Sequence, residues 1–104
     1  MKKLILLVML TIATNAQAFT KKELADFEQN CGMRNGAICY NLGLIYEHGS
    51  GVKQNYKTAV KWYEKACNAM DFDGCFNLAV AYDLGRGVDK DPKKALEIYE
   101  GNCQ

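Results

Sequence analysis

The sequence has few of the residues from which hydrolytic and metal sites are commonly built. It contains one histidine, His48, and one serine, Ser50, among 104 residues. A zinc-dependent hydrolase needs clustered histidines, so a single histidine argues against that class. Basic and acidic side chains are nearly equal in number, 13 and 12, and this balance gives no indication of a nucleic-acid-binding surface. After residue 18, no apolar run is long enough to cross a membrane.

The first eighteen residues have the features of a secretory signal peptide. Lys2 and Lys3 form a positive start, residues 4–13 are an almost continuous apolar run, and residues 16–18 are the small-residue cleavage site Ala-Gln-Ala. The apolar run is about half as long as the roughly 20 residues of a membrane span. We therefore expect cleavage before Phe19 and a secreted or periplasmic protein; an uncleaved membrane anchor is the alternative.

The segment that remains, residues 19–104, is large enough for one small domain. It keeps all five cysteines and has 11 basic and 12 acidic side chains. A hydrophobic core of this size is marginal without reinforcement. Export places the cysteines in an oxidising compartment, so disulfides are the expected reinforcement.

The exported segment repeats itself at an interval of 36 residues without a gap. Residues 39–46 align with residues 75–82, and Gly49-Ser50-Gly51-Val52 aligns with Gly85-Arg86-Gly87-Val88. The further matches are Ala59, Tyr63, Glu64 and Cys67 with Ala95, Tyr99, Glu100 and Cys103. The predicted units are a leading segment at 19–30, a first repeat at 31–66 and a second repeat at 67–104.

Each repeat is predicted to consist of two helices. In the first helix, apolar and small residues recur at i, i+3, i+4 and i+7, the spacing of one helix face. This face contains Cys39, Leu42, Gly43 and Tyr46 in one repeat and Cys75, Leu78, Ala79 and Tyr82 in the other. In the second helix, the expected buried residues are Ala59, Trp62, Tyr63, Ala66, Ala95, Ile98 and Tyr99. Small residues at the middle of the first face should allow a neighbouring helix to approach closely.

Glycines and capping residues set the predicted helix ends. Gly49 and Gly85 follow the first helices, and glycine adopts the left-handed conformation without a Cβ clash. Asn55 and Asp91 are suitable N-caps for the second helices.

The leading segment has the pattern of a single second helix. Residues 21–30 match that helix, with Phe27 at the tyrosine position. We therefore predict an all-α fold, an α-solenoid of two 36-residue helix-pair repeats plus a leading helix, stapled by disulfides.

The cysteines flank the joins between units. Cys31 and Cys39 are eight residues apart, as are Cys67 and Cys75. In a continuous helix this separation is about 12 Å, whereas a disulfide needs Cα atoms within roughly 7 Å, so a bridged chain must reverse between them. Local pairing is favoured, although five cysteines and two bridges allow fifteen arrangements. Cys103 is then unpaired, which indicates either a truncated repeat array or a free thiol able to form an intermolecular disulfide.

The repeat unit resembles that of a known family. It contains the pattern Leu-Gly…Tyr…Gly-x-Gly-Val…Ala…Tyr-Glu-x-Ala-Cys, which resembles the Sel1-like repeat, a relative of the tetratricopeptide repeat. The added cysteine pairs are similar to those of the secreted, cysteine-rich Hcp-like branch, and the resemblance spans residues 21–103. It implies an antibiotic-resistance role, because members are described as β-lactam-binding proteins with slow β-lactamase activity. The resemblance assigns no catalytic residue to this sequence.

The residues themselves give little support for hydrolysis. Ser50 and Lys53 have the Ser-x-x-Lys spacing of the penicillin-recognising serine enzymes, but they lie in a predicted turn and the companion motifs are absent. We interpret them as part of a solvated turn. His48 is expected in a last helical turn, where a cation suits the helix dipole. Because the cysteines should be oxidised, we expect no metal or other cofactor.

Two asparagines are the candidate binding residues. Asn41 and Asn77 occupy equivalent positions beside the buried face of the first helices, which line the concave face of related solenoids. They could hydrogen-bond an extended peptide, or they could form a structural bond between repeats. The repeated carboxylates are expected on solvated faces or in inter-repeat pairs; they are Glu47, Glu64, Asp83 and Glu100.

Two functions therefore remain. One is a secreted protein that binds a β-lactam or cell-wall fragment and hydrolyses it slowly, as the resemblance implies. The other is a non-catalytic scaffold that binds a peptide or protein partner on its concave face.

Overall fold

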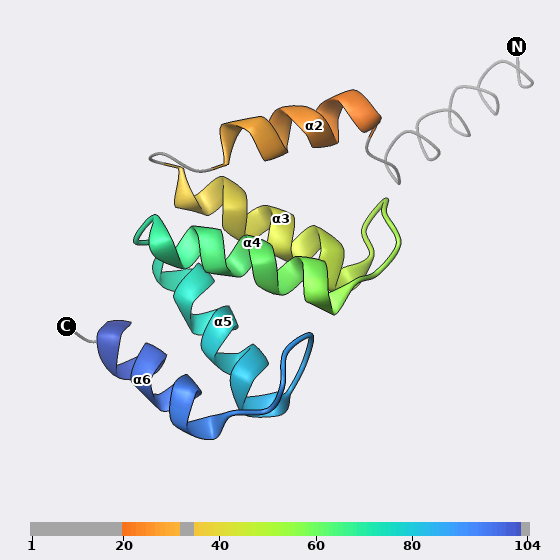
Figure 1. Cartoon of the computed structure of the whole chain (residues 1–104). Helices are drawn as coiled ribbons and strands as arrows, with labels where there is room; N and C mark the ends of the chain where they lie inside the picture. The colour runs from red at the N-terminus through yellow and green to blue at the C-terminus, as the bar shows by residue number, and fades with distance from the viewer. Residues whose placement is uncertain (1–19, 32–34, 103–104) are drawn as a thin grey trace, which may run out of the picture.

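The computed structural model describes residues 20–31 and 35–102, and these residues form a stack of five helices. The helices are α2 (Lys21–Asn30), α3 (Gly36–His48), α4 (Tyr56–Asn68), α5 (Phe72–Leu84) and α6 (Pro92–Asn102). They follow one another along the stack, with α2 and α6 at opposite ends (Figure 1). No strand occurs in these two ranges, so the predicted all-α solenoid is confirmed.

The two first helices, α3 and α5, end at the predicted glycines. Gly49 and Gly85 have φ values of 67° and 68°, in the left-handed region. The following backbone N–H groups, those of Ser50 and Arg86, donate hydrogen bonds to carbonyls in the last turn of the preceding helix. These bonds satisfy carbonyl groups that a helix end leaves without partners.

The N-termini of four helices are capped by side chains. In each case the cap accepts a hydrogen bond from the backbone N–H three residues later, at 2.9–3.1 Å. The caps are Thr20 for α2, Asn55 for α4, Asp71 for α5 and Asp91 for α6. The two predicted N-caps, Asn55 and Asp91, are confirmed.

The core lies where α4 packs between α3 and α5. Tyr63 is its largest member, with 1% of its surface exposed. A Cβ at Gly43 would collide with the Tyr63 ring, so the predicted close approach at a small residue is confirmed there. In contrast, α2 contacts α3 but buries none of its own residues.

The predicted buried face of α4 is wrong at one position. Trp62 is half-buried rather than buried, and the Lys65 ammonium lies 4.8 Å from its ring centroid. Val60 is buried instead, with 5% of its surface exposed. The reason is that α4 has neighbours on two sides, α3 and α5, so the arc of the helix that faces the core is shifted relative to a single-faced helix.

Aromatic and aliphatic residues at the ends of the predicted faces are less buried than expected. They are half-buried because they lie where the stack meets solvent; these residues are Tyr46, Tyr82, Ile98 and Tyr99. Tyr46, Tyr82 and Ile98 still pack against the core cluster.

Both joins between units contain a disulfide. Cys31 is bonded to Cys39 and Cys67 to Cys75, with Cα atoms 4.8 and 4.3 Å apart. This is the local pairing that the cysteine spacing favours, and each bond connects the end of a second helix to the next first helix. Two further sequence predictions, the signal peptide at 1–18 and the free thiol of Cys103, lie outside the described residues.

The second join reverses the chain with a hydrogen-bonded turn. Met70 has a φ of 66°, and its N–H donates to the Cys67 carbonyl. The Asp71 N–H donates to the Ala66 carbonyl. These two bonds around a left-handed residue form a Schellman motif, in which glycine is the usual residue.

None of the helices in the described part of the chain combines the length and the apolar character that a membrane crossing requires.

Candidate functional site

Two cavities open between successive helices, and equivalent positions of the repeat line both. We call the cavity beside α2 and α3 the first groove and the cavity beside α4 and α5 the second groove. Their volumes are about 340 and about 100 Å³. Five pairs of lining residues are 36 positions apart: Phe27 and Tyr63, Asn41 and Asn77, Leu44 and Val80, Ile45 and Ala81, and Ser50 and Arg86. The same groove is therefore built twice along the stack.

The two predicted binding asparagines lie in these two grooves. Asn41 lines the first groove and is exposed, whereas Asn77 lines the second groove and is half-buried. Each precedes a buried leucine, Leu42 or Leu78. Because neighbouring residues on a helix differ by about 100° in direction, a core leucine places the preceding asparagine on the groove wall.

Tyr63 brings a buried hydroxyl group to the second groove. This hydroxyl has no hydrogen-bond partner, although the side chains of Asn77 and Glu47 lie close enough to influence it. Burial raises the pKa of Tyr63 well above its usual range, Asn77 lowers it, and the negative charge of Glu47 raises it further. The hydroxyl therefore stays protonated near neutral pH. A ligand that hydrogen-bonds this hydroxyl would therefore gain affinity here.

Two charged residues of the second groove were not identified from the sequence. Glu47 was expected on a solvated face or in an inter-repeat pair, but its half-buried side chain lines this cavity. Its carboxylate is 3.4 Å from His48 Nε2. Arg86 lies with its guanidinium 5.2 Å from the Tyr56 ring centroid. A comparison of the repeats could have indicated Arg86, because serine stands at the equivalent position 50.

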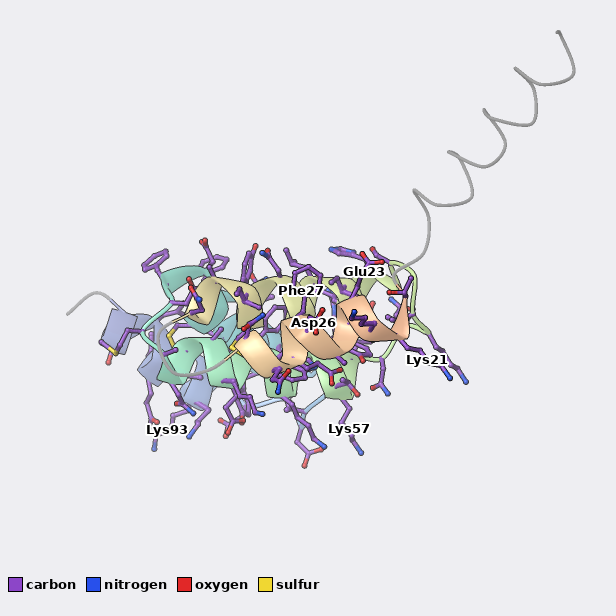
Figure 2. All side chains as sticks on the ribbon, turned by 90° about the horizontal axis from the view of Figure 1, so that it is seen from above. Lys21, Glu23, Asp26, Phe27, Lys57 and Lys93 are labelled. Atoms are coloured by element: carbon purple, nitrogen blue, oxygen red, sulfur yellow. A yellow bond between two sulfur atoms is a disulfide. The ribbon has the colours of Figure 1, made fainter. Side chains whose placement is uncertain are left out.

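The first groove is more apolar than the second. Phe27 stands where Tyr63 stands in the second groove, so the hydroxyl is missing, and Leu44 and Ile45 widen the apolar wall. Away from the grooves the second helices carry charge. Lys57 and Lys93, at equivalent positions in the first turns of α4 and α6, project from one edge of the molecule, away from Phe27 (Figure 2).

The residues considered for catalysis lie at the exposed end of α3 and in the loop that follows it. Ser50 and Lys53 are exposed in the loop after α3 rather than on one helix face, as the solvated-turn interpretation predicts. His48 is exposed in the last turn of α3. In residues 20–31 and 35–102, no three histidine, cysteine or acidic side chains are grouped to hold a metal ion.

Comparison with known proteins identifies the repeat. The family model described as Sel1 repeat matches residues 38–69 and 72–100, more than half of the chain. The chain belongs to the Sel1 repeat family. Each match covers one first helix and the second helix that follows it, α3 with α4 and α5 with most of α6. A comparison with the curated proteins finds no match.

Two solved structures support the family assignment, and the first of them is a cysteine-rich member. The chain is similar to Helicobacter pylori cysteine rich protein B, with 34% identity and a TM-score of 0.74 over 90% of this chain and 71% of that protein. It is also similar to a Sel1 repeat protein from Oxalobacter formigenes, with 32% identity and a TM-score of 0.71 over 91% of this chain. The match covers 37% of the Oxalobacter protein, so the present chain spans little more than a third of it. The resemblance seen in the sequence is therefore confirmed.

Proposed function

We propose that this protein is a non-catalytic scaffold that binds an extended segment of a protein partner along its repeated grooves. The observation that carries the proposal is the recurrence of five groove-lining positions at an interval of 36 residues. A repeated surface is suited to a ligand that is itself repetitive, and the backbone of an extended peptide is the simplest such ligand.

The spacing of the grooves fits an extended chain. The two first helices, α3 and α5, contact each other directly, and packed helices are typically 8–10 Å apart. An extended peptide rises about 3.3 Å per residue, so about three residues would separate a side chain in the first groove from one in the second. A segment of six to eight residues, at roughly this rise, would occupy both grooves.

The asparagines provide the means to hold a peptide backbone. Each side-chain amide of Asn41 and Asn77 carries one acceptor and two donor hydrogens, so each can bond a peptide N–H and a carbonyl group. Such bonds do not depend on the partner's side chains. Affinity would come from the asparagines and selectivity from the residues deeper in each groove.

We place the protein outside the cytoplasm, in the secreted or periplasmic fraction. Two disulfides in so small a domain favour an oxidising compartment. The signal-peptide pattern of the sequence supports the same location.

The β-lactam-binding and hydrolysing function implied by the family resemblance is the less supported candidate. Ser50, the one serine of the sequence, is exposed in a loop. The one histidine, His48, is also exposed and contacts Glu47. We expect the pure, oxidised protein to turn over a chromogenic cephalosporin no faster than the reduced, unfolded protein does. Turnover that requires the fold and is lost in Ser50→Ala would establish the enzymatic function instead.

The binding proposal is tested by selection of peptides and by paired variants. Random decapeptides would be selected on the oxidised protein and the affinity of the best one measured by fluorescence anisotropy. The double variant Asn41→Ala, Asn77→Ala should weaken binding at least about tenfold, because each lost hydrogen bond contributes about 0.5–1.5 kcal/mol. The control is Asn68→Ala, an exposed asparagine at the end of α4. Equal affinities of the two variants would contradict the proposal.

A further inference from the structure

The second groove contains a hydroxyl and a carboxylate, those of Tyr63 and Glu47, to which the peptide-binding proposal assigns no ligand. The Asn77 amide oxygen beside them has two lone pairs, so it can accept a hydrogen bond from the peptide backbone and one from a second group. We propose that the Tyr63 hydroxyl, the Asn77 amide and the Glu47 carboxylate form a binding site for a primary ammonium group, which a lysine side chain of the bound peptide supplies. The inference adds a side-chain specificity to the proposed function and rests on it for the identity of the partner.

Burial and hydrogen bonding indicate that this cluster is prepared for a ligand. The Tyr63 side chain is almost fully buried, with 1% of its surface exposed, and its hydroxyl has no hydrogen-bond partner. Glu47 and Asn77 line the same cavity and act on the hydroxyl. All three side chains can present an oxygen acceptor, and Glu47 adds a negative charge. An ammonium group has three donor hydrogens and a positive charge, so its bonding capacity matches this cluster.

The size and walls of the cavity suit an alkylammonium group. Its volume is about 100 Å³, and a cavity of about 10–15 Å³ on this measure is enough for one water molecule. An ammonium with two or three methylene groups therefore fits this space. Three small apolar residues supply contacts for the methylenes: Ala59, Val60 and Ala81.

The positive charge that also lines this cavity is held to one side. The Arg86 guanidinium lies over the Tyr56 ring, 5.2 Å from its centroid, in the geometry of a cation–π contact. From there it can donate to a backbone carbonyl of the peptide beside the lysine. Arg86 is exposed, whereas the Tyr63 hydroxyl is buried, so solvent screens the repulsion between Arg86 and an ammonium bound at the hydroxyl.

The first groove lacks these features, which makes the specificity different at the two sites. Phe27 replaces Tyr63, and Ser50 replaces Arg86. The apolar residues Leu44 and Ile45 instead line a larger cavity. The predicted partner segment therefore has an apolar residue for the first groove and a lysine for the second, about three residues away in an extended chain.

The site can be tested with n-butylammonium chloride, without any knowledge of the partner. Titration of the oxidised, nitrogen-15-labelled protein should shift the side-chain amide signals of Asn77 in NMR spectra. The variant Glu47→Gln should weaken this binding about tenfold, because it removes a charge-assisted hydrogen bond. Tyr63→Phe should weaken it about threefold to tenfold and should fold normally, because it keeps the buried ring and removes only a hydroxyl that makes no hydrogen bond within the protein.

The matched control is Asp83→Asn. Asp83 is the repeat equivalent of Glu47, with an exposed side chain, so this change alters the net charge by the same amount and should leave the affinity unchanged. Sodium butyrate and n-butanol should not shift the Asn77 signals. The inference is overturned if butyrate binds in place of butylammonium, if no ammonium concentration that preserves the fold shifts Asn77, or if Glu47→Gln binds as Asp83→Asn does.

Peptides separate this inference from the proposed function. If a selected peptide binds equally well with lysine or with norleucine at the position in the second groove, the ammonium site is wrong and the scaffold function stands. If butylammonium binds as expected but no peptide does, the scaffold function is wrong and the ammonium site stands.

Discussion

Met70 is the one non-glycine residue with a positive φ in the described part of the chain. Its φ is 66° at the end of α4, and 89% of its surface is exposed. A left-handed conformation costs an L-residue with a Cβ roughly 1–2 kcal/mol relative to glycine, and part of this is offset because glycine loses more entropy on folding.

We therefore expect Met70→Gly to raise the free energy of unfolding by up to about 1 kcal/mol. Little buried apolar surface is lost, since the methionine side chain is in solvent. Urea denaturation of the oxidised protein measures the change, and Met70→Ala is the control because alanine keeps the Cβ. A Met70→Gly protein no more stable than Met70→Ala would show that the strain is absent.

Tyr63 links the second groove to the pH dependence of stability. Its folded pKa is raised by burial, so the folded state holds this proton more tightly than the unfolded state, where tyrosine has a pKa of about 10. This tighter proton binding stabilises the folded state in full below about pH 10. The free energy of unfolding declines as the pH rises above that value, because unfolding then releases the proton.

Tyr63→Phe removes the ionisable hydroxyl and with it this decline in stability at high pH. The stability of the variant relative to the wild-type protein should therefore increase between pH 9 and pH 11, by up to about 1.4 kcal/mol per pH unit above 10. Urea denaturation at the two pH values, with brief exposure to alkali to keep the disulfides intact, measures the difference. Stability curves that stay parallel would contradict the buried, proton-retaining hydroxyl.

The residues predicted correctly from the sequence are those whose role depends on local chemistry. Gly49 and Gly85 end helices because of the left-handed conformation, and Asn55 and Asp91 begin them through short side-chain bonds. The burial of Trp62 was predicted wrongly, because it depends on how many helices surround α4. Glu47 lines a groove because α4 and α5, which come later in the chain, pack beside it. The sequence pattern around Glu47 therefore did not indicate this position.

At the level of the helices, the two disulfides have different neighbours and should have different effects. The Cys67–Cys75 bond connects α4 and α5, which share the core. The Cys31–Cys39 bond attaches α2, none of whose residues is buried. Each bridge closes a loop of the same length and should contribute roughly 2–3 kcal/mol in the chain-entropy account.

We expect the double variant Cys67→Ala, Cys75→Ala to lower the melting temperature of the whole domain by about 10–20 °C. This estimate combines the lost stability of the bridge with a shift of about 4–8 °C for each kcal/mol in a domain of this size. Because Cys39 is fully buried, the other bridge is best removed with Cys31→Ala alone, which leaves no cavity in the core. This variant should instead release α2, seen as loss of amide hydrogen-exchange protection in residues 21–30 while α4 and α5 remain protected. Reductant should produce both effects in the wild-type protein. An unchanged melting temperature in reductant would refute the reinforcing role of the disulfides.

The helices could be predicted well from the sequence because the repeat gives each pattern twice. A buried face seen at Cys39 and Leu42 is seen again at Cys75 and Leu78. The repeat does not predict which equivalent positions differ in burial. Leu96 has the position of Val60 but is 56% exposed rather than 5%, because no helix in the described part of the chain covers α6 as α5 covers α4.

For the molecule as a whole, the sequence indicated a repeated surface but not its chemistry. Asn41 and Asn77 were identified as a pair, since the interval of 36 residues relates them. The difference between the grooves, apolar at α2 and polar at α4, arises from three helices meeting at Tyr63 and could be seen only in the structure. In the proposed function, specificity would therefore depend on deviations from the repeat as much as on the repeat itself.

The most direct test of the scaffold function is to map a bound peptide onto the protein. A decapeptide selected on the oxidised protein would be titrated into nitrogen-15-labelled protein, and the side-chain amides of Asn41 and Asn77 compared with the indole N–H of Trp62. We predict that both asparagines shift with one common dissociation constant and that Trp62, which lines neither groove, does not. Shifts at Trp62 with both asparagines unchanged would contradict the proposal that the repeated grooves are the binding surface.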